Sequence, residues 1–565
     1  MSPERLLQHF VQIAEAPAAV PRLRRFILDL AVRGKLVEQN LEDEPASELL
    51  KRIEAEKARL VKLGEIRKEK PRQLVDKESV PFNLPPSWEW VPIRKIAADR
   101  GQKIPDKEFL YIDVSAIDKE SGKIAEPLVL SPDAAPSRAR KIVLKGDVIY
   151  SCVRPYLLNI AVVDKDFRPE PIVSTAFAVL NGFGMLVPRY LWVVLRSPFF
   201  VICVEEKMRG QAYPAINDRD FALLPFPLPP FTEQHRIVAK VDELMALCDE
   251  LEAAQTKRER RRDRLVAATL HGLNNGDESG EPGIRPTFEE SARFYFNQLP
   301  LLTTCPEHIH QLRQTILNLA VRGKLVPQDP NDELASELLT KIEAEKSRLV
   351  KLGEIRKEKP LPLIDKESVP FNLPPSWQWV PIRKIAADRG QKIPSNDFSY
   401  IDVSAIDKER GKIAKPQVLI PEAAPSRARK IVQKGDVIYS CVRPYLLNIA
   451  VVDEDFRPEP IVSTAFAVLN GFGMVVPRFL WIVLRSPFFV ICVEEKMRGQ
   501  AYPAINDRDF APLPFPLPPF AEQHRIVAKV DNLMALCDKL EAQLTNSATT
   551  RRHFLEATLQ DALSA

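Results

Sequence analysis

The chain has 565 residues, with 80 basic and 76 acidic side chains and a formal net charge of +4. This length allows several domains, and the small net charge excludes a uniformly basic nucleic-acid-binding surface, so any basic surface must be local. The chain also lacks both a signal peptide after Met1 and an apolar run long enough to cross a bilayer. The seven cysteines lack metal-ligand spacing, which indicates reduced thiols in a cytoplasmic protein that does not engage a membrane.

The same long sequence occurs twice, and the second copy is displaced by 289 residues. Tyr111–Asp118 recurs as Tyr400–Asp407, and the match needs no gap from Leu30 to Ala253. Repeats set the architecture of a chain, and this period is too long for a solenoid unit. We therefore expect two similar halves, each with at least one whole domain and its own binding surface.

The first half begins with a predicted helical region over residues 1–79. Apolar residues from Leu23 to Ala31 keep helical spacing up to Gly34, and a second amphipathic helix is predicted over 45–62. Residues 80–230 form a predicted mixed α+β domain that opens and closes with proline-rich segments. Its short β-type runs lie at 111–114, 147–153, 160–163 and 177–180, and helices are predicted at 189–195 and 198–207.

A long helix is predicted over residues 231–275, with apolar residues at the spacing of a coiled-coil seam. About forty residues at 1.5 Å each give a rod of roughly 60 Å. The second copy repeats this order as a linker over 276–305, a central helical region over 306–368, a second domain over 369–519 and a final helix over 520–565. We expect the two seams to pack against each other, and their residues are Ile237, Val241, Leu244, Cys248 and Leu251, with Ile526, Val530, Leu533, Cys537 and Leu540.

Signals for catalysis are absent, and we assign no catalytic residue, metal ligand or cofactor to this chain. There is no phosphate-binding loop of the G-x-x-x-x-G-K-[ST] type, and Gly182-Phe-Gly184 is better interpreted as a turn. Carboxylates such as Asp133 and Glu205 lie too far apart to predict a metal-dependent nuclease. The histidines do not cluster; His235 and His524, near helix starts, are interpreted as structural.

Three segments carry residue types suited to DNA recognition. Arg154 and Tyr156 follow an apolar strand, where arginine could pair with guanine and tyrosine could contact phosphate or stack on bases. The alternative is an arginine in a surface ion pair at the end of a strand. The loop 207–219 holds side chains that read base edges, or it is an ordinary surface loop. Residues 137–141 form a small basic loop that suits phosphate, or it is merely solvated.

The candidate DNA contacts are the basic, aromatic and amide side chains of these segments in both copies. In the first copy they are Arg138, Arg140, Lys141, Arg154, Tyr156, Lys207, Arg209, Gln211, Tyr213 and Asn217. In the second copy they are Arg427, Arg429, Lys430, Arg443, Tyr445, Lys496, Arg498, Gln500, Tyr502 and Asn506.

Five segments together resemble the specificity subunit of Type I restriction–modification enzymes. They are Ile316–Gln328, Ala335–Lys346, Leu373–Trp379, Gly146–Ile149, and Leu228–Val238 ahead of a long helix. Each motif alone is modest evidence, but all five occur in the family's order, twice. The resemblance covers almost the whole chain.

This resemblance implies two target-recognition domains separated by long antiparallel helices with pseudo-two-fold symmetry. It also implies that the chain reads double-stranded DNA. Its expected partners are two methyltransferase subunits that carry S-adenosylmethionine, and restriction subunits that use ATP and Mg²⁺. In the family the two recognition domains usually differ, whereas here they are nearly the same. We therefore expect a gapped, near-palindromic target whose half-sites lie about one helical turn (~34 Å) apart.

Two other functions remain open at this point. A protein-interaction scaffold could also use two similar domains, but it should show no DNA sequence preference. The chain could instead be the recognition subunit of a related enzyme that cuts on both sides of its site, in which case nuclease and methylase share one partner. An autonomous enzyme is disfavoured for want of a catalytic constellation.

Overall fold

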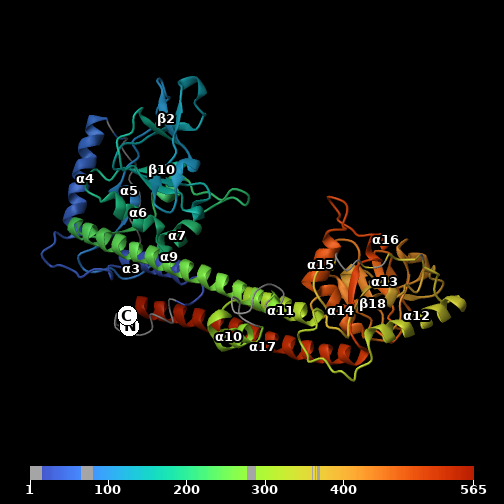
Figure 1. The fold of residues 1–565 in the computed structure, drawn as a ribbon. Coiled ribbons are helices and arrows are strands. Elements are labelled where there is room, and N and C mark those ends of the chain that lie inside the picture. Colours follow the sequence, from blue (N-terminus) through green and yellow to red (C-terminus); the bar gives the residue numbers. More distant parts are fainter. Residues whose placement is uncertain are drawn as a thin grey trace. The chain divides into compact units, whose positions relative to one another are not determined.

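A computed structural model describes residues 15–64, 66, 81–275, 288–358, 360–362, 364 and 369–564. The chain divides into two compact units, which are Met1–Arg258 with Ala548–Ala565, and Glu259–Ser547. Each unit combines helices with a sheet-rich domain (Figure 1), so the expected α+β class is confirmed. Within the described residues, no helix is long and apolar enough to span a membrane.

The helices of the first unit are α3 (Ala19–Val32), α4 (Ala46–Leu63), α5 (Ile93–Ile96), α6 (Pro188–Arg196), α7 (Pro198–Glu205), α8 (Asp218–Phe221) and the first part of α9 (Phe231–Asn275). Its strands are β1 (Glu89–Pro92), β2 (Phe109–Ile112), β3 (Ile117–Asp118), β4 (Lys123–Ile124), β5 (Leu128–Leu130), β6 (Ala139–Ile142), β7 (Val148–Ser151), β8 (Ile160–Val162), β9 (Pro171–Ser174), β10 (Phe177–Leu180) and β11 (Pro225–Leu228). Short 3₁₀ turns are η2 (Val114–Ala116), η3 (Pro132–Ala134) and η4 (Pro155–Leu157).

The second unit repeats this order after α10 (Phe288–Leu302). Its helices are α11 (Pro306–Val321), α12 (Ala335–Lys351), α13 (Ile382–Ile385), α14 (Pro477–Arg485), α15 (Pro487–Glu494), α16 (Asp507–Phe510) and the first part of α17 (Phe520–Ser564). Its strands are β12 (Gln378–Pro381), β13 (Phe398–Ile401), β14 (Ile406–Asp407), β15 (Lys412–Ile413), β16 (Gln417–Leu419), β17 (Ala428–Ile431), β18 (Val437–Ser440), β19 (Ile449–Val451), β20 (Pro460–Ser463), β21 (Phe466–Leu469) and β22 (Pro514–Leu517). Its 3₁₀ turns are η5 (Val403–Ala405), η6 (Pro421–Ala423) and η7 (Pro444–Leu446).

The sheet-rich domain of each unit is built around two sheets. In the first unit a four-stranded sheet has the order β5-β2-β9-β6, and a three-stranded sheet has the order β10-β7-β8. Strands β2 and β9 are parallel neighbours, while β6 runs antiparallel to β9. One apolar cluster, which includes Ile112, Ile149 and Val173, draws on strands of both sheets.

Strand β7 lies between two apolar clusters, one on each of its faces. Ile149 packs in the cluster shared with the four-stranded sheet, whereas Val148 and Tyr150 pack in the cluster that holds α6 and α7. Successive side chains of a strand point to opposite faces. All four residues of β7 are buried, so its continuous apolar run reflects burial on both faces.

A set of polar side chains, which we call the polar lock, joins the sheet-rich domain to α9. Glu233, which is 1% exposed, accepts hydrogen bonds from Trp88 Nε1 (3.0 Å) and Gln39 Nε2 (2.6 Å). The side chain of Gln234 accepts from Val187 N (2.9 Å) and donates to Pro229 O (3.2 Å). The bonds from Trp88, from Val187 and to Pro229 are buried, and such shielded bonds hold the long helix and the domain in one orientation.

The seam of each long helix has a different partner from the one predicted. Ile237, Val241 and Cys248 of α9 share a core with α3 of the same unit, and Arg24 of α3 pairs with Asp249 at 2.6 Å. The seam of α17 likewise shares a core with α11. The prediction that the two seams cover each other is wrong, since an amphipathic helix is satisfied by the nearest apolar face, here the short helix that precedes each domain.

Two further findings depart from the predicted order of elements. Helix α10 occupies 288–302, within the range predicted as a linker; the remainder of that linker up to residue 287 lies outside the described residues. The end of α17 belongs to the first unit, where Leu555 and Leu559 pack against Ala19 and Phe26 of α3. Arg22 pairs with Glu556 across the same contact at 2.9 Å.

Candidate nucleic-acid interface

The strand directions bring several polar segments of each sheet-rich domain to one end. Strands β2 and β9 are parallel, so Asp113 and Thr175 follow them at the same edge of the sheet. The antiparallel strand β6 begins there, and Thr175 N donates to Arg138 O at 2.8 Å. Ligand sites of open sheets form where the carboxyl ends of parallel strands meet.

Backbone hydrogen bonds extend this edge sideways to the predicted recognition loop. Cys152 N donates to Ala176 O at 2.8 Å, and Ile216 N donates to Cys152 O at 3.0 Å. We call the connected segments the loop end of the domain, namely residues 113–116, 137–139, 152–159, 174–176 and 207–217. The far end, at the other termini of the same strands, comprises residues 104–108, 131–134, 143–147 and 163–170.

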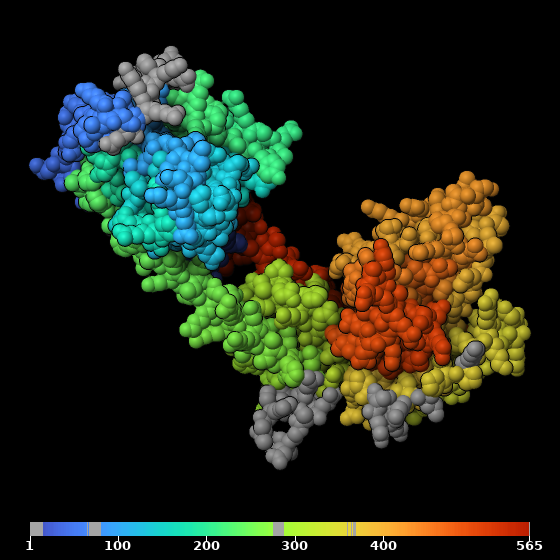
Figure 2. Space-filling view, turned by 90° about the horizontal axis from the view of Figure 1, so that it is seen from above, coloured from blue at the N-terminus to red at the C-terminus, as the bar shows by residue number. Residues whose placement is uncertain are grey.

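Residues 209–215 form a small hairpin, which we call the finger. Arg209 and Ala215 exchange two backbone hydrogen bonds of 2.9 Å each, and Arg154 N donates to Pro214 O at 2.8 Å. Gly210 has φ +96°, and a Cβ there would lie 3.1 Å from Tyr213 O, so the turn requires glycine. Figure 1 shows the finger of the first unit as a teal-green loop beside α7, and Figure 2 shows the red-orange finger of the second unit standing out from its surface.

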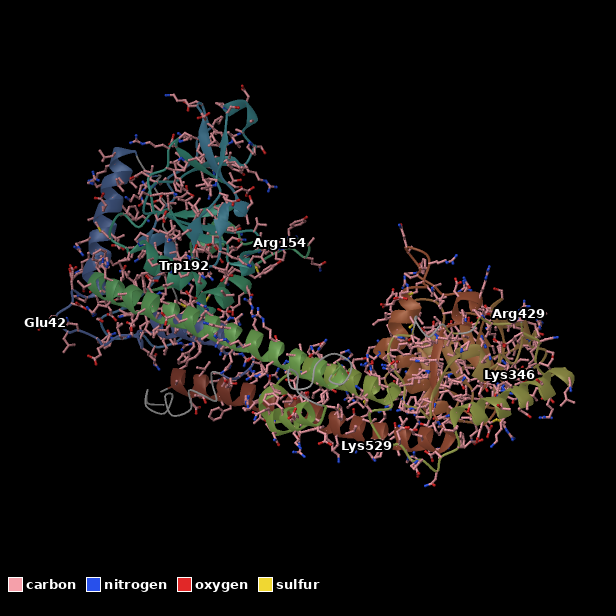
Figure 3. The ribbon with its side chains drawn as sticks, viewed as in Figure 1. Glu42, Arg154, Trp192, Lys346, Arg429 and Lys529 are labelled. Atoms are coloured by element: carbon pink, nitrogen blue, oxygen red, sulfur yellow. The ribbon has the colours of Figure 1, made fainter. Side chains whose placement is uncertain are left out.

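The finger carries the exposed basic and aromatic side chains that the sequence singled out. The Arg209 side chain is 82% exposed and Tyr213 is 68% exposed, while Lys207 and Gln211 are also exposed. Arg154 lies at the base of the finger (Figure 3), with its Cζ 4.6 Å from the centre of the Tyr213 ring. The second unit repeats the stack with Arg443 and Tyr502 at 4.7 Å. A cation over an exposed ring gains about 0.5–1 kcal/mol, which orders both side chains at the surface.

Two of the predicted DNA-binding residues, Lys141 and Lys430, are buried and pair with carboxylates of the protein itself. Lys141 is 2% exposed, with Nζ 3.1 Å from Asp99 and 3.0 Å from Asp218. Lys430 is also buried, 2.9 Å from Asp388. The prediction that these two lysines contact phosphate is therefore wrong, because a buried ammonium held by carboxylates cannot reach DNA. Lys141 instead ties the sheet to Asp218, the first residue of α8, directly after the finger.

Burial lowers the pKa of Lys141, but Asp99 and Asp218 raise it by more than burial lowers it. The pKa of Lys141 therefore lies above its ordinary value, and the side chain is charged at neutral pH.

Asn217 caps α8, since its Oδ1 accepts from Asp220 N at 2.8 Å and its Nδ2 donates to Asp220 Oδ2. Asn506 caps α16 in the same way. Both asparagines are exposed, so each caps a short helix and the base-reading role stays a prediction.

The remaining candidates lie at or beside the loop end. Arg138 and Arg427 are exposed, whereas Arg140 and Arg429 are half-buried and donate to the backbone of Ser137 and Ser426 at 3.2 Å. Arg209 and Arg498 also pair with carboxylates of α8 and α16, at 3.6 and 3.3 Å. Tyr156 and Tyr445 are exposed by 44% and 43%. Both units therefore present the same basic and aromatic surface.

The structure adds a cluster that the sequence analysis missed. Tyr111, Asp113 and Ser174 meet Arg138 at the loop end; Asp113 also accepts a hydrogen bond from Val114 N at 2.7 Å. Burial raises the pKa of Tyr111 and Asp113 adds to this, whereas Ser174 and Arg138 oppose it. The strand β9, which begins with proline, could have revealed this cluster. Its parallel pairing with β2 places Ser174 beside Tyr111 and Asp113.

Comparison with known proteins identifies the family. The chain is 35% identical over 571 residues to the Type I restriction enzyme EcoAI specificity subunit of Escherichia coli, covering 96% of this chain and 94% of that one. It is 31% identical over 572 residues to the EcoEI specificity subunit of the same species, with the same coverage. No family model matches the chain.

Two solved structures resemble the chain at 24% identity. They are the HsdS subunit from Thermoanaerobacter tengcongensis (TM-score 0.43, 86% of this chain and 98% of that one) and a chain from a study of complex assembly and conformational transition of the type I R-M system (TM-score 0.47, 86% and 99%). The identity to the two curated subunits extends over nearly the whole length of each protein. The chain therefore belongs to the specificity subunits of Type I restriction enzymes.

Proposed function

We propose that each unit places its loop end on one half-site of a gapped, near-palindromic DNA target. The observation that supports this is the distribution of differences between the two copies. Every residue of the loop end, as defined above, is identical in the second copy. Identical side chains on the same scaffold form the same hydrogen bonds with base edges, so both units should read the same short sequence.

The inversion of the second half-site follows from the antiparallel long helices that membership of the family implies. The polar lock at Glu233, and its counterpart in which Trp377 donates to Glu522 at 2.9 Å, would keep each reader at a fixed angle to its helix. Phosphate contacts by exposed arginines and lysines supply affinity, whereas base contacts at the loop end supply specificity.

In this proposal the chain itself is non-catalytic and acts in the cytoplasm, where it recruits the enzymes that modify or cut DNA. Its partners would be two methyltransferase subunits, which bind S-adenosylmethionine, and restriction subunits, which use ATP and Mg²⁺. The curated relatives are named as specificity subunits of restriction enzymes, which gives no support to the scaffold alternative.

Methylome sequencing of a strain that expresses this chain with its methyltransferase subunit tests the proposal. The expected result is one gapped motif whose two half-sites are inverted complements. The matched controls are the single variants Arg154→Ala and Arg443→Ala, which should weaken methylation to the same degree because each disables one of two equal readers. An asymmetric motif with unrelated half-sites would overturn the symmetric target while leaving DNA recognition in place.

A further inference from the structure

The turn η4 presents two exposed apolar side chains between residues of strained backbone. Arg154 has φ 48° and ψ 54°, and Leu158 has φ 55° and ψ 39°. Neither is glycine, and left-handed backbone costs such residues on the order of 1–2 kcal/mol each. The second unit repeats both conformations at Arg443 and Leu447. The fold therefore maintains the same strain at two independent places.

This backbone holds an apolar tip at the surface. Tyr156 is 44% and Leu157 is 43% exposed, whereas Pro155 between them and Arg154 is buried. Leu157 N donates to Arg154 O at 3.0 Å and Leu158 N donates to Pro155 O at 2.9 Å, so the tip is a closed turn. Full burial of a leucine side chain is worth about 1.5–3 kcal/mol. A large apolar side chain kept exposed between two residues of strained backbone indicates a role outside the folding core.

The surroundings of the tip favour DNA as the partner. Arg154 connects the tip to the finger, whose exposed Tyr213 and Arg209 project from the same end of the domain. A peptide or a membrane surface would need a wider apolar area than one tyrosine and one leucine. Apolar side chains flanked by arginines match proteins that insert a wedge between neighbouring base pairs and thereby unstack them.

We propose that Leu157 and Leu446, each beside an exposed tyrosine, enter the DNA and partly open one base step in each half-site. The inference rests on the proposed DNA-recognition function and extends it from reading base edges to deforming the helix. The cost of opening a step depends on its sequence, so the wedge would add specificity at a base pair that no side chain hydrogen-bonds. The strained backbone holds the wedge in place before DNA arrives.

The test uses the complex of the full chain with its methyltransferase subunit and gapped duplexes in which 2-aminopurine replaces one base at a time. Positions that methylome sequencing identifies as methylated are left out, because the methyltransferase can itself unstack them. Binding of the unaltered complex should raise the fluorescence at one position of each half-site several-fold. The variant Leu157→Ala/Leu446→Ala should lose this rise and change its affinity by less than about tenfold, because the lost apolar contact and the avoided unstacking oppose each other.

Two variants serve as controls. Leu157→Met/Leu446→Met keeps an apolar side chain of similar volume and should retain the rise. Leu144→Ala removes a leucine of similar exposure, 46%, from the far end and should change nothing. If the complex binds its site without a rise at any position, or if the alanine variant keeps the rise, the wedge is wrong and DNA recognition stands. If no gapped duplex binds at all, the proposed function itself fails.

Discussion

The two ends of each recognition domain have diverged to different degrees. At the loop end the two copies are identical, whereas at the far end Lys107 is replaced by Asn396, Leu144 by Gln433 and Lys165 by Glu454. The same strands connect both ends, and within them the buried Leu110 of β2 is replaced by Ser399. Edge strand β5 differs too, with Leu128 replaced by Gln417. Charge and polarity have thus changed at the far end and in β5, and have stayed fixed at the residues where we place DNA.

The contrast also separates two kinds of lysine and arginine. Arg154 is at the loop end, half-exposed and stacked on an exposed tyrosine, while Lys141 is buried between carboxylates one strand away. In sequence Arg154 follows an apolar run and Lys141 precedes one, so both are basic residues beside a strand signal. Only the direction of the side chain distinguishes a group that can meet DNA from one that holds the loop in place.

The largest effect should come from removing both stacked arginines. Arg154→Ala/Arg443→Ala should weaken binding of the specific target by about 1–3 kcal/mol per half-site, the range of a bidentate arginine–guanine pair. Assembly with the methyltransferase subunit should be unchanged in size-exclusion chromatography. Gel-shift titration with specific and unrelated duplexes measures the difference. Normal methylation by the double variant would make these arginines structural and would remove the main distinction of the loop end.

Replacement of the buried lysine should act on stability and less on specificity. Lys141→Met leaves Asp99 and Asp218 without their shared partner; both carboxylates are partly exposed, at 39% and 65%, so we expect a loss of about 1–2 kcal/mol in the free energy of unfolding. Lys430→Met should cost less, because its second carboxylate, Asp507, is 3.9 Å away. Chemical denaturation of each variant measures both losses.

The pH dependence provides a check on this ion pair. Because the pKa of Lys141 is raised in the fold, its contribution should persist through neutral pH and be lost only as the pH rises through the raised value. The unaltered protein and Lys141→Met should therefore differ by the same amount at pH 6 and pH 8. A difference that already shrinks over this range would contradict the assignment.

A smaller effect is expected where the two units differ in their helices. Asp29 of α3 is 6% exposed and its counterpart in α11 is Asn318, which donates to Asn274 at 3.0 Å. Burial raises the pKa of Asp29, although Arg33 opposes this. Its folded state thus favours the protonated acid, and stability is lost as the pH rises through the raised pKa. Asp29→Asn should therefore become more stable than the unaltered protein as the pH rises from acidic to neutral. Thermal unfolding of both proteins at several pH values measures this difference in stability. A difference that stays constant, or that changes in the opposite direction as the pH rises, would contradict the prediction.

The smallest effect should follow from exchanging the far ends. Lys107→Asn, Leu144→Gln and Lys165→Glu together give the first copy three of the far-end side chains of the second. Surface substitutions of this kind usually change stability by less than about 0.5 kcal/mol. The methylated motif and the rate of methylation should both stay the same. A changed motif would show that the far end takes part in recognition.

The sequence predicted much of the fold because its signals were local. The repeat gave two equal units, strand β10 (Phe177–Leu180) was predicted with its observed bounds, and α7 begins at the predicted Pro198. It could not place β9, whose four residues carry no periodicity and whose pairing with β2 bridges about sixty residues of chain. The same limit explains the errors over Lys141 and over the helix seams. Burial and helix partners are long-range properties that a periodic pattern leaves undetermined.

The end of α17 determines when the first unit can be completed during synthesis. Leu555 and Leu559 fill the apolar face of α3 beside Phe26, although more than five hundred residues of chain separate them. Domains generally fold in the order in which the ribosome releases them. Here the second unit, Glu259–Ser547, is complete before the first, which must wait for residues 548–565. A premature stop codon ahead of Leu555 would therefore damage the part of the protein that was made first.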